Sequence, residues 1–322
     1  MKKIKVGIYD NNCGHQVTRV FDSTSDINAV PYACCNCPNA ENYDGIKIYN
    51  TLEEMIADDN VELISLCSPN RRLQAKETVI CMQAGKHVYA EKPCAMTERE
   101  LDEIINASVK YGVQFHEMAG SAFEQPFLAM RKLVLGGKLG EIVQVYTQKS
   151  YPLNLNKRPH DEDIDGGLLM QVGVHNLRLI EHITGLKITD IYAVDTQLGN
   201  TVENSALHTA VSYMMKLENG GVASAVANYL NFPKAIGRHG NECVKVFGTN
   251  GYAEITDAGR KSQVIINNEV IGPLDTSEKS KDYFEYFIDS LLGIDKMPLT
   301  LEDELHPTRM VIRASQNILS KE

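Results

Sequence analysis

The chain has 322 residues, of which 43% are hydrophobic and 23% charged, so it is long enough for two domains and lacks the composition of a disordered chain. Its formal net charge is -10 and no lysine- or arginine-rich run offsets it, which argues against a nucleic-acid partner. No apolar run is long enough to cross a bilayer or form a signal peptide, so we expect a cytoplasmic protein with no membrane partner.

The first third of the chain alternates short apolar runs with helical spacing. Strands are expected at Ile4–Tyr9, Val30–Cys35, Ile46–Tyr49, Val61–Cys67, His87–Ala90 and Val113–His116. Helices are expected through Val17, Val20 and Phe21, over Leu52–Ala57 and Arg71–Ala84, and from Thr97 to Tyr111. Thr51 and Thr97 have the spacing of N-caps. This alternation predicts a doubly wound parallel sheet of the Rossmann type.

The pattern changes near residue 120, where strand-like runs begin to follow one another directly. These strands are expected at Ile142–Tyr146, Ile188–Val194, Ala206–Met214, Gly221–Asn228, Val244–Phe247, Tyr252–Ile255 and Val264–Ile266. Helices are expected at Phe127–Leu135, Leu168–Ile183, Asp282–Leu292 and Leu301–Leu319. Asn219-Gly220 and Asn250-Gly251 predict hairpin turns. The prediction is therefore an α/β chain, with a dinucleotide-binding domain at 1–120. Residues 121–322 would form an α+β domain with a large, mostly antiparallel open sheet.

Five short motifs follow one another along the chain. They are Ser68-Pro69-Asn70, Ala84-Gly85-Lys86-His87-Val88, Glu91-Lys92-Pro93, Gly137-Lys138-Leu139-Gly140-Glu141-Ile142, and Gly166-Gly167 followed by His175. In order and separation they resemble the glucose-fructose oxidoreductase/inositol dehydrogenase (Gfo/Idh/MocA) family. The resemblance implies an NAD(P)-dependent oxidoreductase acting on CH–OH groups of a sugar or polyol. It also implies a homodimer or homotetramer formed through the second sheet.

Lys92 and His175 are the candidate acid/base residues. Lys92 follows a buried strand at the carboxyl edge of the predicted sheet, where it can hold a hydroxyl oxygen and exchange a proton with it. Gln171 and His175 lie four residues apart and therefore share one face of a helix. In the family the first of this pair is an aspartate. A glutamine hydrogen-bonds a hydroxyl but does not accept its proton.

Tyr151 and Arg158 are predicted to bind substrate together with Lys92, Gln171 and His175, because they lie on the loop that enters this helix. His160 is adjacent to them. The acidic stretch Asp161–Asp165 is interpreted as a solvated loop, so no metal site is expected there. The eight cysteines are interpreted as reduced thiols rather than as disulfide or metal ligands.

The cofactor-binding candidates follow the first, second, fourth and fifth strands. They are Asn11, Asn12, Cys13, Gly14, His15, Cys35, Asn36, Cys67, Ser68, Pro69, Asn70, Glu91 and Lys92. Asp10–His15 retains only one glycine of the usual G-x-G-x-x-G, and Asn36 stands where an acid commonly binds the ribose. No arginine there suggests a 2′-phosphate, so NAD is favoured over NADP.

Three functions remain open. The first is a dehydrogenase. The second is a net-neutral redox enzyme, which eliminates or epimerises a sugar with tightly held NAD. The third is a ligand-binding family member that has lost the chemistry, suggested by the altered glycine loop and by Gln171.

Overall fold

The computed structural model describes residues 2–9, 17, 20–21, 27–37, 40, 43 and 45–318. The chain divides into two compact units, Met1–Gly120 with Lys281–Glu304, and Ser121–Ser280 with Leu305–Glu322. The sequence pattern indicated one domain boundary, near residue 120. It did not indicate that residues 281–304 belong to the first unit. The helix expected through Val17, Val20 and Phe21 lies largely outside the described residues.

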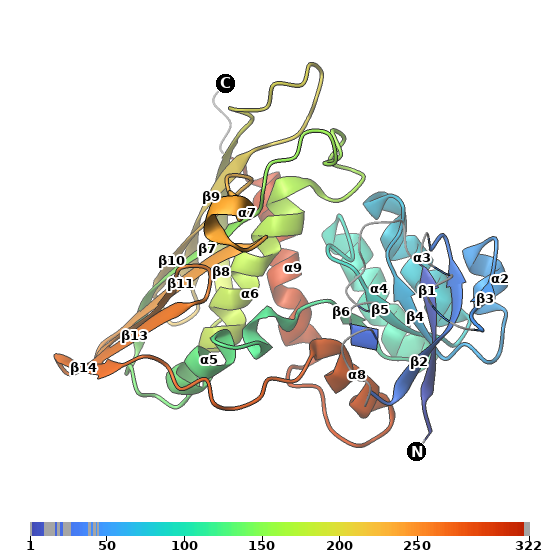
Figure 1. Cartoon of the computed structure of the whole chain (residues 1–322), viewed down its shortest axis with the longest axis horizontal. Coiled ribbons are helices and arrows are strands. Elements are labelled where there is room, and N and C mark those ends of the chain that lie inside the picture. Colours follow the sequence, from blue (N-terminus) through green and yellow to red (C-terminus); the bar gives the residue numbers. More distant parts are fainter. Residues whose placement is uncertain are drawn as a thin grey trace. The chain divides into compact units, whose positions relative to one another are not determined.

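The first unit contains a six-stranded parallel sheet in the order β3-β2-β1-β4-β5-β6 (Figure 1). Its strands are β1 (Ile4–Tyr9), β2 (Ala29–Cys35), β3 (Lys47–Ile48), β4 (Leu63–Leu66), β5 (His87–Ala90) and β6 (Phe115–Glu117). Its described helices are α2 (Leu52–Ile56), α3 (Arg71–Gln83), α4 (Glu98–Tyr111) and α8 (Tyr283–Leu291). Thr51 and Thr97 are the N-caps of α2 and α4, as predicted. The Rossmann-type sheet is confirmed.

The strand order fixes where a ligand crevice lies. From β1 the chain moves outward through β2 and β3, and then returns to place β4 on the other side of β1. Open parallel sheets bind ligands at the carboxyl ends of the strands flanking such a reversal. The crevice is therefore bordered by the segments that follow β1, β2 and β4.

The second unit contains an eight-stranded sheet in the order β14-β13-β12-β11-β7-β10-β9-β8. Its strands are β7 (Ile142–Ser150), β8 (Ile188–Thr196), β9 (Ala210–Leu217), β10 (Val222–Asn228), β11 (Asn241–Gly248), β12 (Gly251–Thr256), β13 (Lys261–Ile266) and β14 (Glu269–Gly272). Of these neighbours β7 and β10 pair in parallel, and the other pairs are antiparallel. The mostly antiparallel sheet is thus confirmed.

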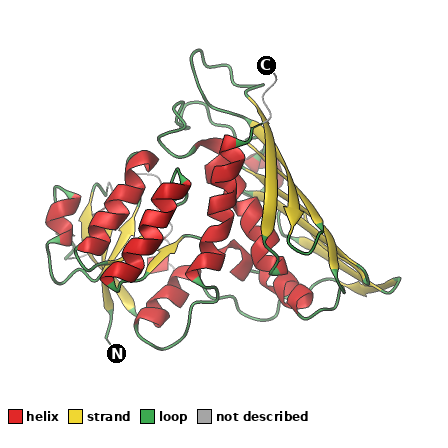
Figure 2. Ribbon diagram, turned by 180° about the vertical axis from the view of Figure 1, so that it is seen from behind, coloured by secondary structure: helices red, strands yellow, loops and turns green. Residues whose placement is uncertain are grey.

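One face of this sheet is covered by helices. The described helical segments of the unit include α5 (Phe127–Leu135), η3 (Leu168–Val172), α6 (Gly173–Thr184) and α7 (Pro233–Ile236). The short 3-10 turn η2 (Gly120–Phe123) precedes α5, and α9 (Leu301–Gln316) is the helix in which the two units divide. α5 and α6 lie along the same side of the sheet (Figure 2). Alternating residues of β8 and β9 are buried and exposed, as expected for a sheet with one covered face.

Three local features differ from the expectation. β9 begins and ends three or more residues later than predicted, because Ala206–Thr209 form a loop. β14 and α7 were not predicted, since both are only four residues long. The helix expected at Leu168–Ile183 begins as a π-helical turn, η3, before the α-helix α6.

Among the described residues, no helix is long and apolar enough to cross a membrane.

Candidate active site

Two side chains of α3 hold the backbone on both sides of Lys92. The Gln74 amide donates to the carbonyls of Glu91 and Pro93, and its oxygen accepts from Ser68 N–H. The Arg71 guanidinium donates to the carbonyls of Ser68, at 2.8 Å, and Lys92, at 3.4 Å. Both side chains are buried, so these bonds join the loop after β4 to the loop after β5 in a dry environment. Sequence reasoning missed both residues. The sequence feature that could have identified Arg71 and Gln74 is their spacing, since two polar residues three positions apart lie on the buried face of the helix.

Lys92 itself is buried, with 8% of its surface exposed. Its Nζ lies 3.8 Å from Glu91 Oε1, and the same oxygen accepts the Lys92 backbone N–H at 2.8 Å. Glu91 therefore both orients the lysine and satisfies a backbone donor. A buried ammonium next to a carboxylate can bind a substrate oxygen and exchange a proton with it.

At the end of β2, Cys35 and Asn36 have opposite exposures. Cys35 is 1% exposed, and burial raises the pKa of its thiol, as it does for Cys34. Asn36 is exposed and has φ 56°, and its side chain hydrogen-bonds the Tyr9 hydroxyl at the end of β1. Thus Asn36, and not the thiol of Cys35, is available to a ligand here.

At the end of β4, Cys67 and Ser68 are both fully buried. The Ser68 hydroxyl hydrogen-bonds Glu77, whose carboxyl pKa is raised by burial. Pro69 is exposed, and Asn70 is the N-cap of α3, its side chain accepting from Arg72 N–H. The predicted residues Asn11, Asn12, Cys13, Gly14 and His15 lie outside the described residues.

These described residues fit a nicotinamide dinucleotide. The strand reversal supplies the crevice, the exposed Asn36 amide supplies a neutral partner for ribose hydroxyls, and Lys92 follows β5 in the same sheet. No arginine occurs between Cys35 and Ile46.

In the second unit, four predicted substrate residues lie together. Arg158 Nη1 hydrogen-bonds Gln171 Oε1 at 3.4 Å, and the guanidinium lies 5.8 Å from the Tyr151 ring centre. The rings of Tyr151 and His175 meet edge to face at 6.4 Å. His175 Nδ1 also contacts Ser121 Oγ at 3.3 Å. The structure thus gathers Tyr151, Arg158, Gln171 and His175 from one loop and one helix, as the loop-to-helix pattern predicted.

Further residues that the sequence did not single out surround Tyr151. The buried Lys149 has its Nζ 4.8 Å from this ring centre and forms an ion pair with the half-buried Glu242. The His239 ring packs on Tyr151 at 5.1 Å. Glu242 and His239 come from around the start of β11, far from Tyr151 in sequence, so nothing local could have indicated them. Their packing holds the phenol ring from two sides.

The π-helical turn that carries Gln171 depends on a close contact of Gly173. The Tyr213 hydroxyl donates to the Leu169 carbonyl at 2.9 Å and lies directly against the Gly173 backbone. A Cβ atom at Gly173 would overlap that oxygen. The glycine therefore allows β9 to support η3, and so fixes the spacing between Gln171 and His175.

We predict that Gly173→Ala displaces this turn and lowers kcat/KM by about 10- to 100-fold, because small shifts of positioned groups weaken catalysis strongly. Tyr213→Phe combined with Gly173→Ala is expected to recover part of that loss, since it removes the overlapping oxygen. Steady-state kinetics on wild type and the two variants test this. Equal activity of Gly173→Ala and wild type would contradict it.

The acidic loop is bonded to the segment before β9 rather than solvated throughout. Glu162 Oε1 accepts from the His208 backbone N–H and contacts its Nδ1 at 3.0 Å, and Asp195 lies 3.5 Å from Nε2. His160 contacts Ser205 at 2.9 Å, and Asp165 accepts from Gly167 N–H. Among the described residues, no cluster of three or more His, Cys, Asp or Glu side chains has metal-site geometry.

The contact between Glu162 and His208 makes the stability of the second unit depend on pH. The Glu162 hydrogen bond raises the pKa of His208, so protonated His208 stabilises the fold. That contribution is complete below the unfolded histidine pKa, about 6.5, and is lost as pH rises through the higher folded value. The Tm advantage of wild type over His208→Gln is expected to be about 2–4 °C at pH 6 and to shrink by pH 8.5. Thermal unfolding at both pH values tests this, and a constant advantage would contradict it.

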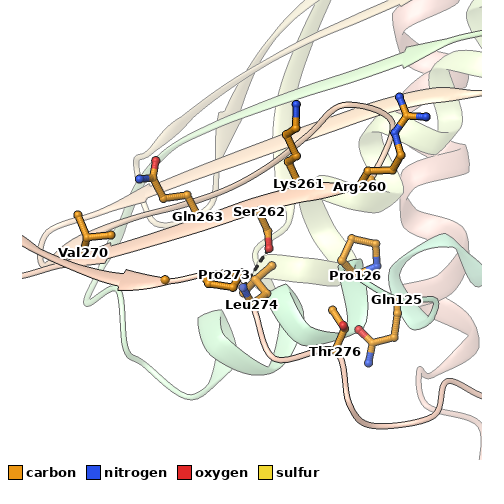
Figure 3. A pocket seen from close by; sticks show the side chains of 12 residues that line it. Gln125, Pro126, Arg260, Lys261, Ser262, Gln263, Val270, Pro273, Leu274 and Thr276 are labelled. Carbon is orange, nitrogen blue, oxygen red and sulfur yellow. Dashed lines mark hydrogen bonds between the residues drawn. The ribbon is translucent and has the colours of Figure 1, made fainter. Parts of the chain in front are cut away.

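A large open cavity of about 840 Å³ lies elsewhere in the second unit (Figure 3). Its lining comes from β13, β14 and the start of α5, and none of the predicted site residues belongs to it. Arg260 pairs with Asp257 at 2.5 Å, and Ser262 Oγ accepts from Leu274 N–H. These two lining side chains are thus engaged with the protein, and we do not assign the chemistry to this cavity.

The chain thus has the architecture of a two-domain dehydrogenase. One domain holds a six-stranded doubly wound sheet with a buried lysine after β5, and the other holds an eight-stranded open sheet. Family models match both parts: "Oxidoreductase family, NAD-binding Rossmann fold" over residues 8–118 and "GFO/IDH/MocA C-terminal domain" over residues 127–254. The chain therefore belongs to the GFO/IDH/MocA oxidoreductase family, and the resemblance inferred from its motifs is confirmed.

Individual relatives agree with this assignment. The chain is 25% identical to the uncharacterized oxidoreductase YrbE of Bacillus subtilis, over 84% of this chain and 80% of that protein. It is 22% identical to myo-inositol 2-dehydrogenase of Thermotoga maritima, over 76% and 69% of the two chains. The structure of a putative oxidoreductase from Thermotoga maritima matches with a TM-score of 0.84 at 25% identity, covering 98% of this chain and 97% of the other.

Proposed function

We propose that this protein is an NAD(P)-dependent dehydrogenase that acts on a carbinol carbon of a sugar, polyol or similar hydroxylated molecule. The observation that carries the proposal is the support of Lys92, a buried ammonium beside Glu91. Gln74 bonds the carbonyls of the two flanking residues, and Arg71 bonds the carbonyl of Lys92 itself. A merely solvated lysine needs no such support. The likeness to a myo-inositol dehydrogenase supports the substrate class.

In this proposal Lys92 and His175 are the catalytic acid/base groups. Lys92 binds the reacting oxygen, and either Lys92 or His175 exchanges the single proton of that hydroxyl as hydride leaves or reaches the carbon. Gln171, which cannot accept a proton as the family's aspartate does, hydrogen-bonds a hydroxyl. Tyr151 and Arg158 complete the polar lining for the substrate. NAD(P), when bound, supplies the acceptor or donor of hydride.

The cofactor would be held by Asn36 at the ribose hydroxyls and by the backbone of Ser68, Pro69 and Asn70 beside α3. By position in the motif, Asn11, Asn12, Cys13, Gly14 and His15 would surround the pyrophosphate. Because no arginine follows β2 before Ile46, we favour NAD over NADP.

The test is denaturation of freshly purified protein with mass spectrometry of the released molecules, alongside calorimetric titration of NAD(H) and NADP(H). Binding of a free nucleotide, followed by its net reduction with a polyol, supports the dehydrogenase. Tightly bound nucleotide without net turnover favours the net-neutral redox enzyme. No release and no binding would overturn both and favour a ligand-binding protein.

We also propose that two or more copies associate through the open face of the eight-stranded sheet. Tyr192 and Met214, 53% and 72% exposed, face each other in register on β8 and β9, and Val194 is 50% exposed beside them. Such adjacent apolar side chains are typical of an interface. Light scattering after size-exclusion chromatography should give a dimer or tetramer that Met214→Lys dissociates. A monomeric wild type would contradict this.

A further inference from the structure

Arg158 is a half-buried cation in the proposed substrate site. Its guanidinium stacks on the Tyr229 ring at 3.9 Å and is steadied by the Gln171 side-chain oxygen at 3.4 Å. Tyr229 is 1% exposed, and burial raises the pKa of its hydroxyl, so the stacking surface is a neutral ring. The guanidinium is therefore held in one plane with a defined orientation.

Within the part of the chain that the structure describes, no carboxylate forms an ion pair with Arg158. The nearby acids have other partners: Glu162 binds His208, and Asp165 binds Gly167 N–H. The other buried cation of the site, Lys149, is already paired with Glu242. Arg158 thus differs from Arg260 of the same unit, whose charge is balanced by Asp257.

A fixed, partly desolvated guanidinium that pairs with no carboxylate of the described residues is well suited to an anionic ligand. Its fork of N–H donors matches a carboxylate in a two-bond geometry, and such charge-assisted bonds are stronger than bonds to neutral hydroxyls. A site that binds only neutral sugars needs donors, but it does not need an uncompensated positive charge that must lose water on binding.

We infer that Arg158 binds a carboxylate of the substrate, so that the substrate is a sugar acid, such as a uronate or aldonate, rather than a neutral sugar. This inference rests on the proposed function for the redox step but concerns binding alone. Gln171 holds the inner edge of the guanidinium, and the remaining N–H groups receive the carboxylate.

The experiment compares matched ligands by calorimetry on the full-length protein, with whichever nicotinamide nucleotide it binds present at saturation. The pairs are D-glucuronate with D-glucose, D-galacturonate with D-galactose, and D-gluconate with D-glucitol. Wild type is measured beside Arg158→Gln, Arg158→Lys and Lys157→Gln. The last is the matched control, because it removes an exposed cation from the adjacent position of the same loop.

At least one acid is expected to bind wild type about 10- to 100-fold more tightly than its neutral partner, the range for a charge-assisted pair. Arg158→Gln should abolish that preference, Arg158→Lys should keep part of it, and Lys157→Gln should leave it intact. If Arg158→Gln does not fold, Arg158→Lys with a preference equal to that of wild type would contradict the two-bond geometry.

Failure of this inference and of the proposed function are distinguishable. If no acid binds wild type more tightly than its neutral partner, or if Arg158→Gln keeps the preference, the inference is overturned, while oxidation of neutral polyols would leave the dehydrogenase standing. If nucleotide does not bind but the acid preference depends on Arg158, the inference holds and the redox function fails.

Discussion

Lys92→Ala is expected to lower kcat by about 10²- to 10⁴-fold, the range for loss of a positioned acid/base group, with little change in Tm. The reason is that removing the side chain leaves the backbone bonds in place, from Gln74 to the two flanking carbonyls and from Arg71 to the carbonyl of residue 92. Steady-state kinetics and thermal unfolding of the same preparation measure the two effects.

Lys86→Ala is the matched control for this prediction. Lys86 is also buried, and its Nζ donates to the Asp58 carbonyl at 2.8 Å, a bond with no place in the proposed site. It should lose stability and keep kcat. An unchanged kcat in Lys92→Ala, or an equal loss in Lys86→Ala, would remove Lys92 from the mechanism.

The largest loss of stability is expected for Glu304→Ala. Glu304 is fully buried in the first unit, where its carboxylate oxygens contact His116 Nδ1 at 2.6 Å and accept from Glu117 N–H at 2.6 Å and from the Tyr283 hydroxyl at 2.7 Å. Removing it leaves three buried polar groups without this partner. The expected loss is about 3–5 kcal/mol, or a Tm lower by roughly 10 °C or more.

Glu302→Ala provides the comparison, because Glu302 is an exposed residue of the same helix, α9. It should change the free energy of unfolding by no more than about 0.5 kcal/mol. The role assigned to Glu304 would be wrong if the two variants melted at the same temperature.

Much of the fold could be predicted from the sequence because its signals are local. Nearly continuous apolar runs such as Leu63–Leu66 mark strands buried on both faces. Thr97 with Glu100 marks a helix start through bonds only three residues apart. Alternation of strands and helices then restricts the connections to right-handed crossovers. The parallel sheet, the antiparallel sheet and the family followed from such signals.

The candidate site could be predicted only in part. Sequence reasoning could identify four of its residues, because they lie on one loop and on the helical segment that directly follows it. These are Tyr151, Arg158, Gln171 and His175. By contrast, Gln74 acts on residues 17 and 19 positions away, and Glu242 meets Lys149 across 93 positions. The return of 281–304 to the first unit has the same origin, since Glu304 meets His116 across 188 positions.

The sequence by itself determined the family, the two sheets and the candidate Lys92 and His175, because apolar periodicity, caps and short motifs are encoded in neighbouring residues. Only the tertiary structure decided how those groups are supported. It showed the bonds from α3 to both sides of Lys92, the Tyr213 hydroxyl against Gly173, and the absence of an acid partner for Arg158 among the described residues. The physical reason is that hydrogen-bond partners, burial and charge balance depend on side chains brought together from segments far apart in the sequence. Neighbouring residues do not encode which of those side chains will meet.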